Sequence, residues 1–494
     1  MTTETRIPYW SAAALSTAVR ERVVTCVEVM TAYLDHIDRI NPLVNAIVSR
    51  RPRAELLDEA AARDDELRAG HHRGWMHGFP HAVKDLADVA GMKTTYGFFR
   101  PPFDVEPATA DSLFVERLRA AGAIFIGKTN TPEFGLGSHT YNNVFGTTLN
   151  AYHQGRSAGG SSGGAAVAVA LRMVPVADGS DFMGSLRNPP GWNNVLGLRP
   201  SLGRVPSLSP EVFVSRAAVE GPIARTAVDL ALLLRTMSGY DARDPLSLEQ
   251  DPASLSRLDQ DGVGGTKVAW LGDLGGYLPM EPEVLRVTGA ALSTFTDLGM
   301  TVTALDGLPA HGTFRGTEDL WPTWLTLRHW LNGFGGLELY DDPQLRKALK
   351  PELVYEVEGL LNGPITGADV LTASVRRSAL YEAFRQLFET YDYVVLPTAQ
   401  VMPFDASLHW PDRIGGVAMT SYHRWMEVST IATLINAPAL AVPAGFSRDG
   451  LPIGLQVIGR NHDDRALLNL ALAWERATTW ADRLSPLLSP FVGS

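Results

Sequence analysis

The stretch GRSAGGSSGGAAVAVALRMVPVADGSDFMGSLR, from Gly155 to Arg187, decides how the rest of the chain is organised. It opens on a glycine and serine run, crosses a small apolar segment over 165–176, and closes on a second turn, predicted over 179–185. Two serine-bearing turns that flank one buried element can meet at the same edge of a core. Glycine permits the positive φ angles of such turns, and their backbone N–H groups can point into one hollow and stabilise an anion. The stretch therefore predicts a site built from main-chain donors and serine hydroxyls.

The composition is that of a soluble globular protein. Of the 494 residues, 45% are hydrophobic and 20% are charged, and the formal net charge of −11 argues against binding to nucleic acid. The N-terminus lacks a basic, apolar signal sequence, and no apolar run approaches the roughly 18 residues that span a bilayer. The single cysteine, Cys26, excludes an internal disulfide framework. We therefore expect a cytoplasmic protein that binds neither nucleic acid nor membrane.

Short apolar strands alternate with helices along the whole chain. A predicted helix over 376–391, for example, leads into the buried run 393–397. This alternation predicts a layered α/β fold with a mixed or parallel sheet. No low-complexity linker divides the chain, so we expect a single domain over residues 1–494. The irregular, aromatic range 306–366 is expected to form a helical insertion over the sheet.

Two familiar catalytic patterns match parts of the sequence. Residues 122–129, GAIFIGKT, fit the spacing of a nucleotide-binding loop, but the interior of this match is a buried apolar strand and no helix follows. Residues 160–164, GSSGG, fit the nucleophile elbow of an α/β-hydrolase, with His462 far enough along the chain to act as base. That elbow requires a buried strand directly before it, whereas residues 150–156 are polar. Neither pattern is supported by its surroundings.

A buried lysine offers another way to activate a serine. Lys84 lies between Val83 and Leu86 in an apolar, strand-like run, and it is one of only six lysines among 43 basic residues. Burial can lower the pKa of a lysine by several units from about 10.4, so that its neutral amine accepts a proton from a hydroxyl. Lys84 is therefore a candidate general base.

Around Lys84 the sequence resembles the amidase signature family. The matching motifs follow the family order and cover nearly the whole chain: residues 78–85 (GFPHAVKD), 127–134 (GKTNTPEF), 159–164 (GGSSGG), 179–187 (GSDFMGSLR), 197–205 (GLRPSLGRV) and 450–456 (GLPIGLQ). The resemblance implies a central mixed β-sheet covered by helices on both faces. It also implies hydrolysis of a carboxylic amide bond with no metal and no organic cofactor.

The same resemblance assigns roles to individual residues. It implies a Ser–cis-Ser–Lys triad in which Ser185 is the nucleophile and Ser161 relays a proton to the base Lys84. The oxyanion hole would be formed by the backbone N–H groups of Phe182, Met183, Gly184 and Ser185. The residues expected to support the active-site loop are Ser162, Asp181 and Arg187.

The sequence departs from the family directly before the nucleophile. Phe182 and Met183 stand where the family usually has smaller residues, which bears on substrate choice more than on the backbone donors. Together with Trp324 and Trp330 from the range 306–366, they predict an apolar pocket for a bulky or aryl substrate.

The sequence thus predicts a hydrolase that acts on a small-molecule amide through an acyl-enzyme, with esters and carbamates as further candidate substrates. Two alternatives stay open. One is the amidotransferase subunit that helps to make Gln-tRNA with a partner chain, and the other is a non-enzymatic binding protein. A homodimer is also left open.

Overall fold

A large mixed sheet forms the centre of the computed structural model, which describes residues 7–491 apart from 99–104, 210, 214, 215, 260, 364, 481 and 482. Its eight strands, in order across the sheet, are β10 (Thr301–Ala304), β9 (Lys267–Trp270), β11 (Tyr393–Pro397), β15 (Pro452–Ile458), β14 (Ala439–Phe446), β7 (Leu196–Arg199), β8 (Val219–Ala224) and β6 (Ala177–Asp181). Strand β9 pairs in parallel with β10 and β11, and the other neighbours pair antiparallel. The prediction of an α/β fold with a mixed sheet is therefore confirmed.

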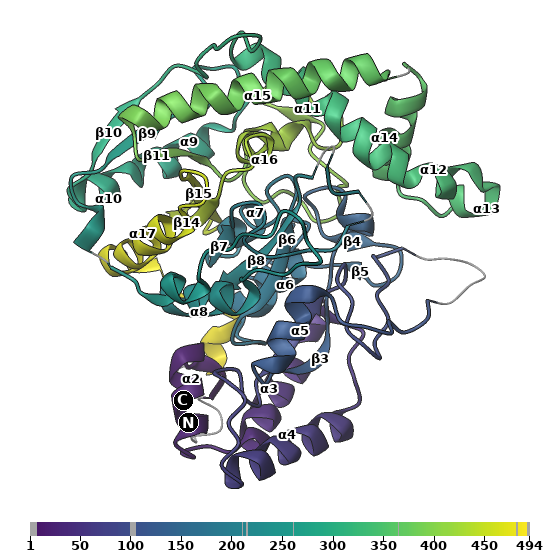
Figure 1. Ribbon diagram of the computed structural model, residues 1–494, viewed down its shortest axis with the longest axis vertical. Coiled ribbons are helices and arrows are strands. Elements are labelled where there is room, and N and C mark those ends of the chain that lie inside the picture. The colour runs from purple at the N-terminus through teal and green to yellow at the C-terminus, as the bar shows by residue number, and fades with distance from the viewer. Residues whose placement is uncertain are drawn as a thin grey trace.

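Helices flank this sheet (Figure 1). They are α2 (Ala12–Arg20), α3 (Cys26–Ile40), α4 (Arg53–Arg68), α5 (Leu113–Ala120), α6 (Gly163–Ala170), α7 (Asn188–Trp192), α8 (Ala227–Met237), α9 (Pro282–Ala290), α10 (Leu292–Asp297), α11 (Leu320–Arg328), α12 (Phe334–Asp341), α13 (Pro343–Arg346), α14 (Pro351–Leu361), α15 (Gly367–Thr390), α16 (Thr430–Leu434) and α17 (Asp464–Ala477). In the part of the chain that the structure describes, none of them is long and apolar enough to cross a membrane.

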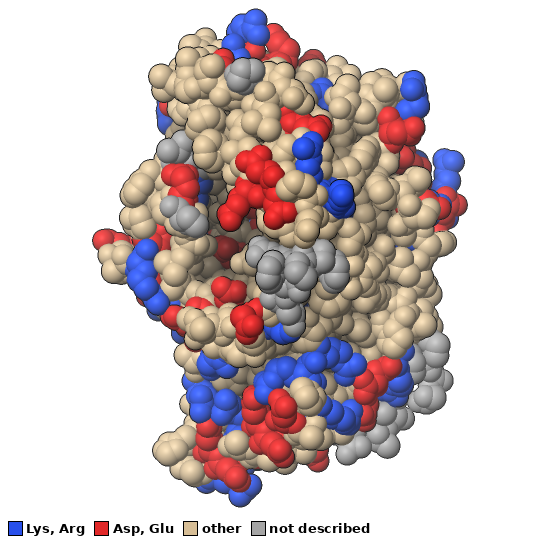
Figure 2. Space-filling model, turned by 90° about the vertical axis from the view of Figure 1, so that its right-hand side faces the viewer, with Lys and Arg blue, Asp and Glu red and all other residues tan. Residues whose placement is uncertain are grey.

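Helices α11 to α14 all fall within the aromatic range 306–366. A π-helical turn from His329 to Gly333 joins α11 to α12. Helices α12, α13 and α14 lie at one edge of the molecule in Figure 1. The face on that side is hollowed, and acidic side chains gather beside the hollow (Figure 2).

A smaller sheet carries the candidate lysine. It consists of β1 (Ile47–Val48), β3 (Ile124–Thr129) and β2 (Pro80–Lys84), with β2 parallel to β3. Every residue of β2 is buried, and β2 packs against β6 of the large sheet. Lys84 is the last residue of β2, so it lies where the two sheets meet.

Helix α6 is short, apolar and buried over its whole length. Its sequence GGAAVAVA begins on two glycines, and a Cβ atom at Gly164 would lie 2.4 Å from the backbone nitrogen of Asn130. Only glycine permits this close approach between the start of the helix and the loop that follows β3. The contact fixes where α6 begins, and with it the position of Ser161 and Ser162.

One predicted turn is partly a strand. The turn predicted over 179–185 begins only at Phe182, because Gly179, Ser180 and Asp181 belong to β6 and pair with β8. The glycine and serine content suggested a turn, but pairing with a strand about 40 residues further on overrides local propensity. The strand conformation has a consequence for the site: alternate residues share a face, so Asp178 and Ser180 both point toward Lys84.

Candidate active site

The amine of Lys84 is surrounded by three serine hydroxyls. Its Nζ lies 2.7 Å from Oγ of Ser161, 2.9 Å from Oγ of Ser162 and 2.9 Å from Oγ of Ser180. The lysine is only 1% exposed. Burial lowers its pKa to about 7, although nearby carboxylates, Asp178 foremost, act in the opposite direction. A lysine in this position is largely neutral at mildly alkaline pH.

The hydrogen bonds around Ser162 indicate which way its hydroxyl points. Ser162 Oγ donates to the backbone oxygen of Ser180 at 3.2 Å, so it accepts the hydrogen bond from Lys84. A neutral amine has two N–H groups and one lone pair. The three contacts of Nζ therefore fit a neutral lysine that donates to Ser162 and Ser180 and accepts from Ser161.

Asp178 holds the backbone of this region without touching the amine. One of its carboxylate oxygens accepts the backbone N–H of Lys84 at 3.1 Å, and the other lies 2.9 Å from Nε2 of His81. Among the described residues, no carboxylate forms an ion pair with Lys84 Nζ. The amine consequently lacks the partner that would hold it in the charged form.

Ser161 lies at the start of the loop that leads into α6. The peptide bond between Gly160 and Ser161 is cis, as the resemblance implied. Ser161 is 3% exposed, and its side chain lines a cavity of about 390 Å³. The serine thus joins the buried lysine to an open space large enough for a small organic molecule.

Ser185 lies on the turn between β6 and α7. It is 6% exposed, it is not part of the cavity wall, and within the described residues no hydrogen bond joins its hydroxyl to Ser161 or Lys84. The structure therefore brings Lys84, Ser161, Ser162 and Ser180 into contact, and the Ser185 hydroxyl stands apart from this group.

The predicted oxyanion donors differ in availability. The backbone N–H of Gly184 donates to Oδ1 of Asp181 at 2.9 Å, so the expectation that it serves an oxyanion is corrected. The amides of Phe182, Met183 and Ser185 make no hydrogen bond to any described residue. Three of the four predicted donors remain, because the carboxylate that shapes the turn occupies the fourth.

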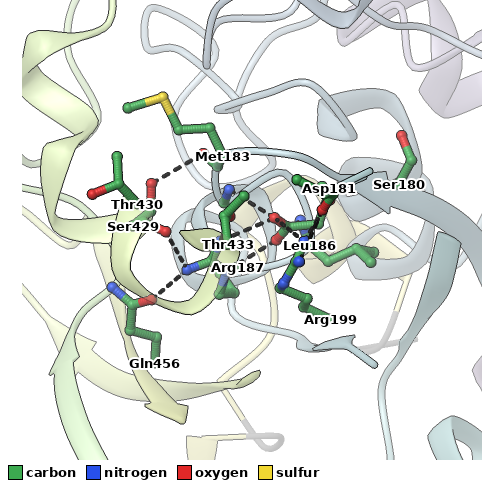
Figure 3. Close-up of polar contacts among 12 residues, drawn as sticks. Ser180, Asp181, Met183, Leu186, Arg187, Arg199, Ser429, Thr430, Thr433 and Gln456 are labelled. Atoms are coloured by element: carbon green, nitrogen blue, oxygen red, sulfur yellow. Dashed lines mark hydrogen bonds and ion pairs between the residues drawn. The ribbon is translucent and has the colours of Figure 1, made fainter. Parts of the chain in front are cut away.

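A buried ion-pair network holds this turn in place (Figure 3). Arg187 donates through Nε and Nη2 to the carboxylate of Asp181, at 3.0 and 2.9 Å, and through Nη1 to Ser429 and Gln456. Arg199 donates to the backbone oxygen of Asp181 at 2.7 Å. Burial raises the pKa of Asp181, but the two arginines outweigh it and hold this pKa well below its usual range. The network ties the turn to the loop around residue 429.

We expect Asp181→Ala to lower the free energy of unfolding by about 3–5 kcal/mol, because it leaves the guanidinium groups of Arg187 and Arg199 buried without their counter-ion. Chemical denaturation measures this change. Glu116→Ala is the matched control, since its partner Arg243 is exposed and should contribute far less. Equal shifts in the two variants would mean that the buried network does not stabilise the turn.

The cavity beside Ser161 has a largely apolar wall. Its apolar side chains are Leu86, Phe134, Leu136, Phe182, Leu208 and Leu331, and its polar ones include Ser180, Glu220 and Asn332. A hydrophobic cavity with a few polar groups is the usual form of a small-molecule site.

The predicted pocket residues are only partly in this wall. Phe182 lines the cavity, but Met183, Trp324 and Trp330 do not. Trp324 is 2% exposed and packs behind Phe182, with 5.3 Å between ring centroids, and Trp330 packs on Phe334. The insertion contributes Leu331 and Asn332 instead. The prediction failed there because the π-helical turn decides which side chains face inward.

Glu220 is a residue of the site that the sequence did not single out. It lies opposite Ser180 in the pairing of β6 with β8, and it lines the cavity. Oε1 accepts a hydrogen bond from Ser207, while Oε2 is buried with no partner among the described residues. Burial raises the pKa of this carboxyl group. No local pattern marks it, because only the strand register brings it to Ser180.

No group of three or more His, Cys, Asp and Glu residues that could hold a metal ion occurs in the described ranges.

Comparison with known proteins adds independent findings. A sequence model of the amidase family matches residues 28–468. The acylamidase of Rhodococcus erythropolis is 35% identical over 486 residues, which cover 97% of this chain and 98% of that protein. A glutamyl-tRNA(Gln) amidotransferase subunit from Thermosynechococcus vestitus is 32% identical over 498 residues, covering 93% and 96%. The crystal structure of a bacterial aryl acylamidase of the amidase signature family matches with a TM-score of 0.88 at 29% identity, covering 98% and 99%.

Proposed function

The chain belongs to the amidase signature family and is an amidase that hydrolyses carbon–nitrogen bonds, and from this premise we propose that it hydrolyses an aryl acylamide through an acyl-enzyme on Ser185. Ser161 and Lys84 would move the proton, and no metal or cofactor would take part. The observation that carries the proposal is the buried Lys84 amine, which contacts three hydroxyls and no carboxylate among the described residues.

The proton would travel along the serines to the lysine. Neutral Lys84 accepts the proton of Ser161, and Ser161 takes that of Ser185 as Ser185 Oγ bonds to the carbonyl carbon of the substrate. The carbon–nitrogen bond then breaks, and the amine leaves with the proton held by Lys84, returned through Ser161. Water attacks the remaining ester by the same relay, which releases the acid and restores Ser185. A small rotation of the Ser185 side chain would have to bring its hydroxyl to Ser161.

The negative charge on the carbonyl oxygen would be stabilised by the free backbone amides of Phe182, Met183 and Ser185. Donors that are fixed before the reaction begins stabilise the transition state without reorganisation. The ion pair of Asp181 with Arg187 fixes the turn that carries them. Gly184 would contribute to the shape of the turn and not to the set of donors.

The apolar wall favours a substrate with an aromatic group. Leu86, Phe134 and Phe182 present apolar side chains close to Ser161, and aromatic rings bury large areas against such surfaces. The structural similarity to a bacterial aryl acylamidase supports the same substrate class. The direct test is to incubate the purified chain alone with acetanilide-type amides and to measure the amine released. No release from any aryl amide would overturn the proposal.

We expect Phe182→Ala to raise KM for an aryl amide about tenfold or more, because the loss of a buried aromatic contact costs roughly 1.4 kcal/mol or more of binding. KM for an acetamide-sized amide should change much less, because such a substrate does not reach the ring. Initial rates with both substrates measure the difference.

Trp330→Ala is the matched control for this prediction. It also removes an aromatic ring, but one that packs on Phe334 outside the cavity wall. The ratio of the two KM values should therefore stay as in the parent enzyme. If Trp330→Ala changes the ratio as much as Phe182→Ala does, the assignment of the acyl pocket is wrong.

A second candidate function is that of a glutaminase working within a larger complex, because of the 32% identity to a glutamyl-tRNA(Gln) amidotransferase subunit. Glutamine carries an α-carboxylate, which calls for a free cation in the pocket. Arg216 lines the cavity, but its guanidinium group is paired with Asp244 at 2.5 and 2.7 Å. This pairing favours the aryl amide. Glutamine hydrolysis that appears only with a partner chain and tRNA would favour the second candidate.

A further inference from the structure

A second cavity lies at the far end of α6 from Ser161. Ser162 directly precedes this helix, whereas Arg172 follows its last turn. Eight helical residues, about 12 Å, separate the two ends. The second cavity has a volume of about 250 Å³. We call it the arginine cavity, and the side chains that define it are Arg172, Arg225, Arg483, Tyr9, Asn194 and Trp480.

The charge in the arginine cavity has one sign. Three of the residues that line it are arginines, and no described residue in its wall is an aspartate or glutamate. None of the three arginines forms an ion pair with a described residue. Two carboxylates lie near the cavity, but both accept backbone N–H groups: Asp229 those of Ala12 and Ala13, and Glu475 that of Ala227. In an acidic protein, arginines that converge without counter-ions are unusual.

Several polar atoms of the cavity residues lack partners. Arg172 Nε, Arg225 Nε, Trp480 Nε1 and Tyr9 Oη are all buried donors with no hydrogen-bond partner among the described residues. The fifth such atom, Asn194 Oδ1, is an acceptor, since the amide nitrogen of Asn194 donates to Tyr152 and to the backbone of Trp480. Buried polar groups in proteins almost always have partners. Four donors and one acceptor call for a ligand that is rich in acceptors.

The guanidinium groups also influence each other. Burial, followed by the charge of Arg225, lowers the pKa of Arg172 to about 10. Two cations that face one cavity repel each other, and an anion between them would relieve that repulsion. Planar guanidinium groups are the side chains best suited to bind carboxylate and phosphate oxygens.

We propose that the arginine cavity binds a small oxyanion, a carboxylate or a phosphate group, at a site separate from the catalytic serines. The aromatic rings of Tyr9, Tyr152 and Trp480 lie beside the arginines. They give the site room for an aromatic body, so benzoate should bind more tightly than acetate. The site does not depend on the proposed function, because none of its residues contacts Lys84, Ser161 or Ser185.

The proposal is tested by titrating the purified full chain with inorganic phosphate, acetate and benzoate in a calorimeter. Arg172→Gln should weaken the binding of the preferred anion at least about tenfold, the effect of losing one charge-assisted hydrogen bond. Tyr9→Phe, which removes one hydroxyl, should weaken it less. Arg243→Gln removes the same charge from an exposed site and should leave the affinity unchanged.

The outcomes separate the two cavities. Lys84→Ala should bind the anion as the parent chain does, because the site lies outside the catalytic cavity. Binding that is insensitive to both Arg172→Gln and Arg225→Gln would place the anion elsewhere and overturn the proposal. Absence of binding for all three anions would overturn it as well. Circular dichroism of each variant shows that a loss of affinity is not a loss of folding, and Arg172→Gln suffices if Arg225→Gln does not fold.

Discussion

Ser185→Ala is expected to lower kcat/KM for an aryl amide by about 10⁴- to 10⁶-fold, because the proposed acyl-enzyme can no longer form. The remaining rate would come from the oxyanion donors and from substrate binding alone. The fold should be unchanged, since the Ser185 hydroxyl makes no hydrogen bond to any described residue. Initial rates and thermal unfolding of the two proteins measure both statements.

The site of acylation can be identified directly. Mass spectrometry of the chain after treatment with a serine-reactive fluorophosphonate should find the adduct on the peptide that contains Ser185. Ser162→Ala is the control, because Ser162 contacts Lys84 and is nevertheless expected to leave labelling in place. An adduct on Ser162 would contradict the proposal and return attention to the nucleophile elbow of an α/β-hydrolase.

Lys84→Ala should lower kcat by about 10²- to 10⁴-fold, the usual contribution of a general base. Lys128→Ala is the matched control: Lys128 is also fully buried and lies on the neighbouring strand β3, but its amine contacts Ala87 and Thr94 and none of the serines. It should affect stability more than the chemical step. If Lys128→Ala lowers kcat as much as Lys84→Ala, the effect is structural and the lysine is not the base.

The pH dependence provides a separate test of Lys84. Burial lowers its pKa to about 7, so the amine is protonated and unable to accept a proton below that value. We therefore expect kcat/KM to fall as the pH decreases through about 7 and to level off above it. The residual activity of Lys84→Ala should lack this inflection. Activity that instead declines as the pH rises through 7 would show that the charged lysine is the working form.

Much of this molecule follows from local patterns in its sequence. The alternation of apolar strands and helices predicted the α/β class, because periodicity is a property of consecutive residues. The order of the motifs predicted the family and pointed to Lys84 and Ser161, which the structure places 2.7 Å apart between Nζ and Oγ. The small residues around Gly164 had already indicated a close approach of the backbone.

The tertiary structure decided which groups meet from distant parts of the chain. Ser180 reads locally as a turn residue, but pairing with β8 makes it part of a strand and sets Glu220 beside it. Gly184 reads as a free donor, yet Asp181, held by Arg187, accepts its N–H. Trp324 supports Phe182 from behind, and Leu331 reaches the cavity in its place. In each case the outcome depends on strand register or on the direction of a side chain, and both are fixed by partners far away in the sequence.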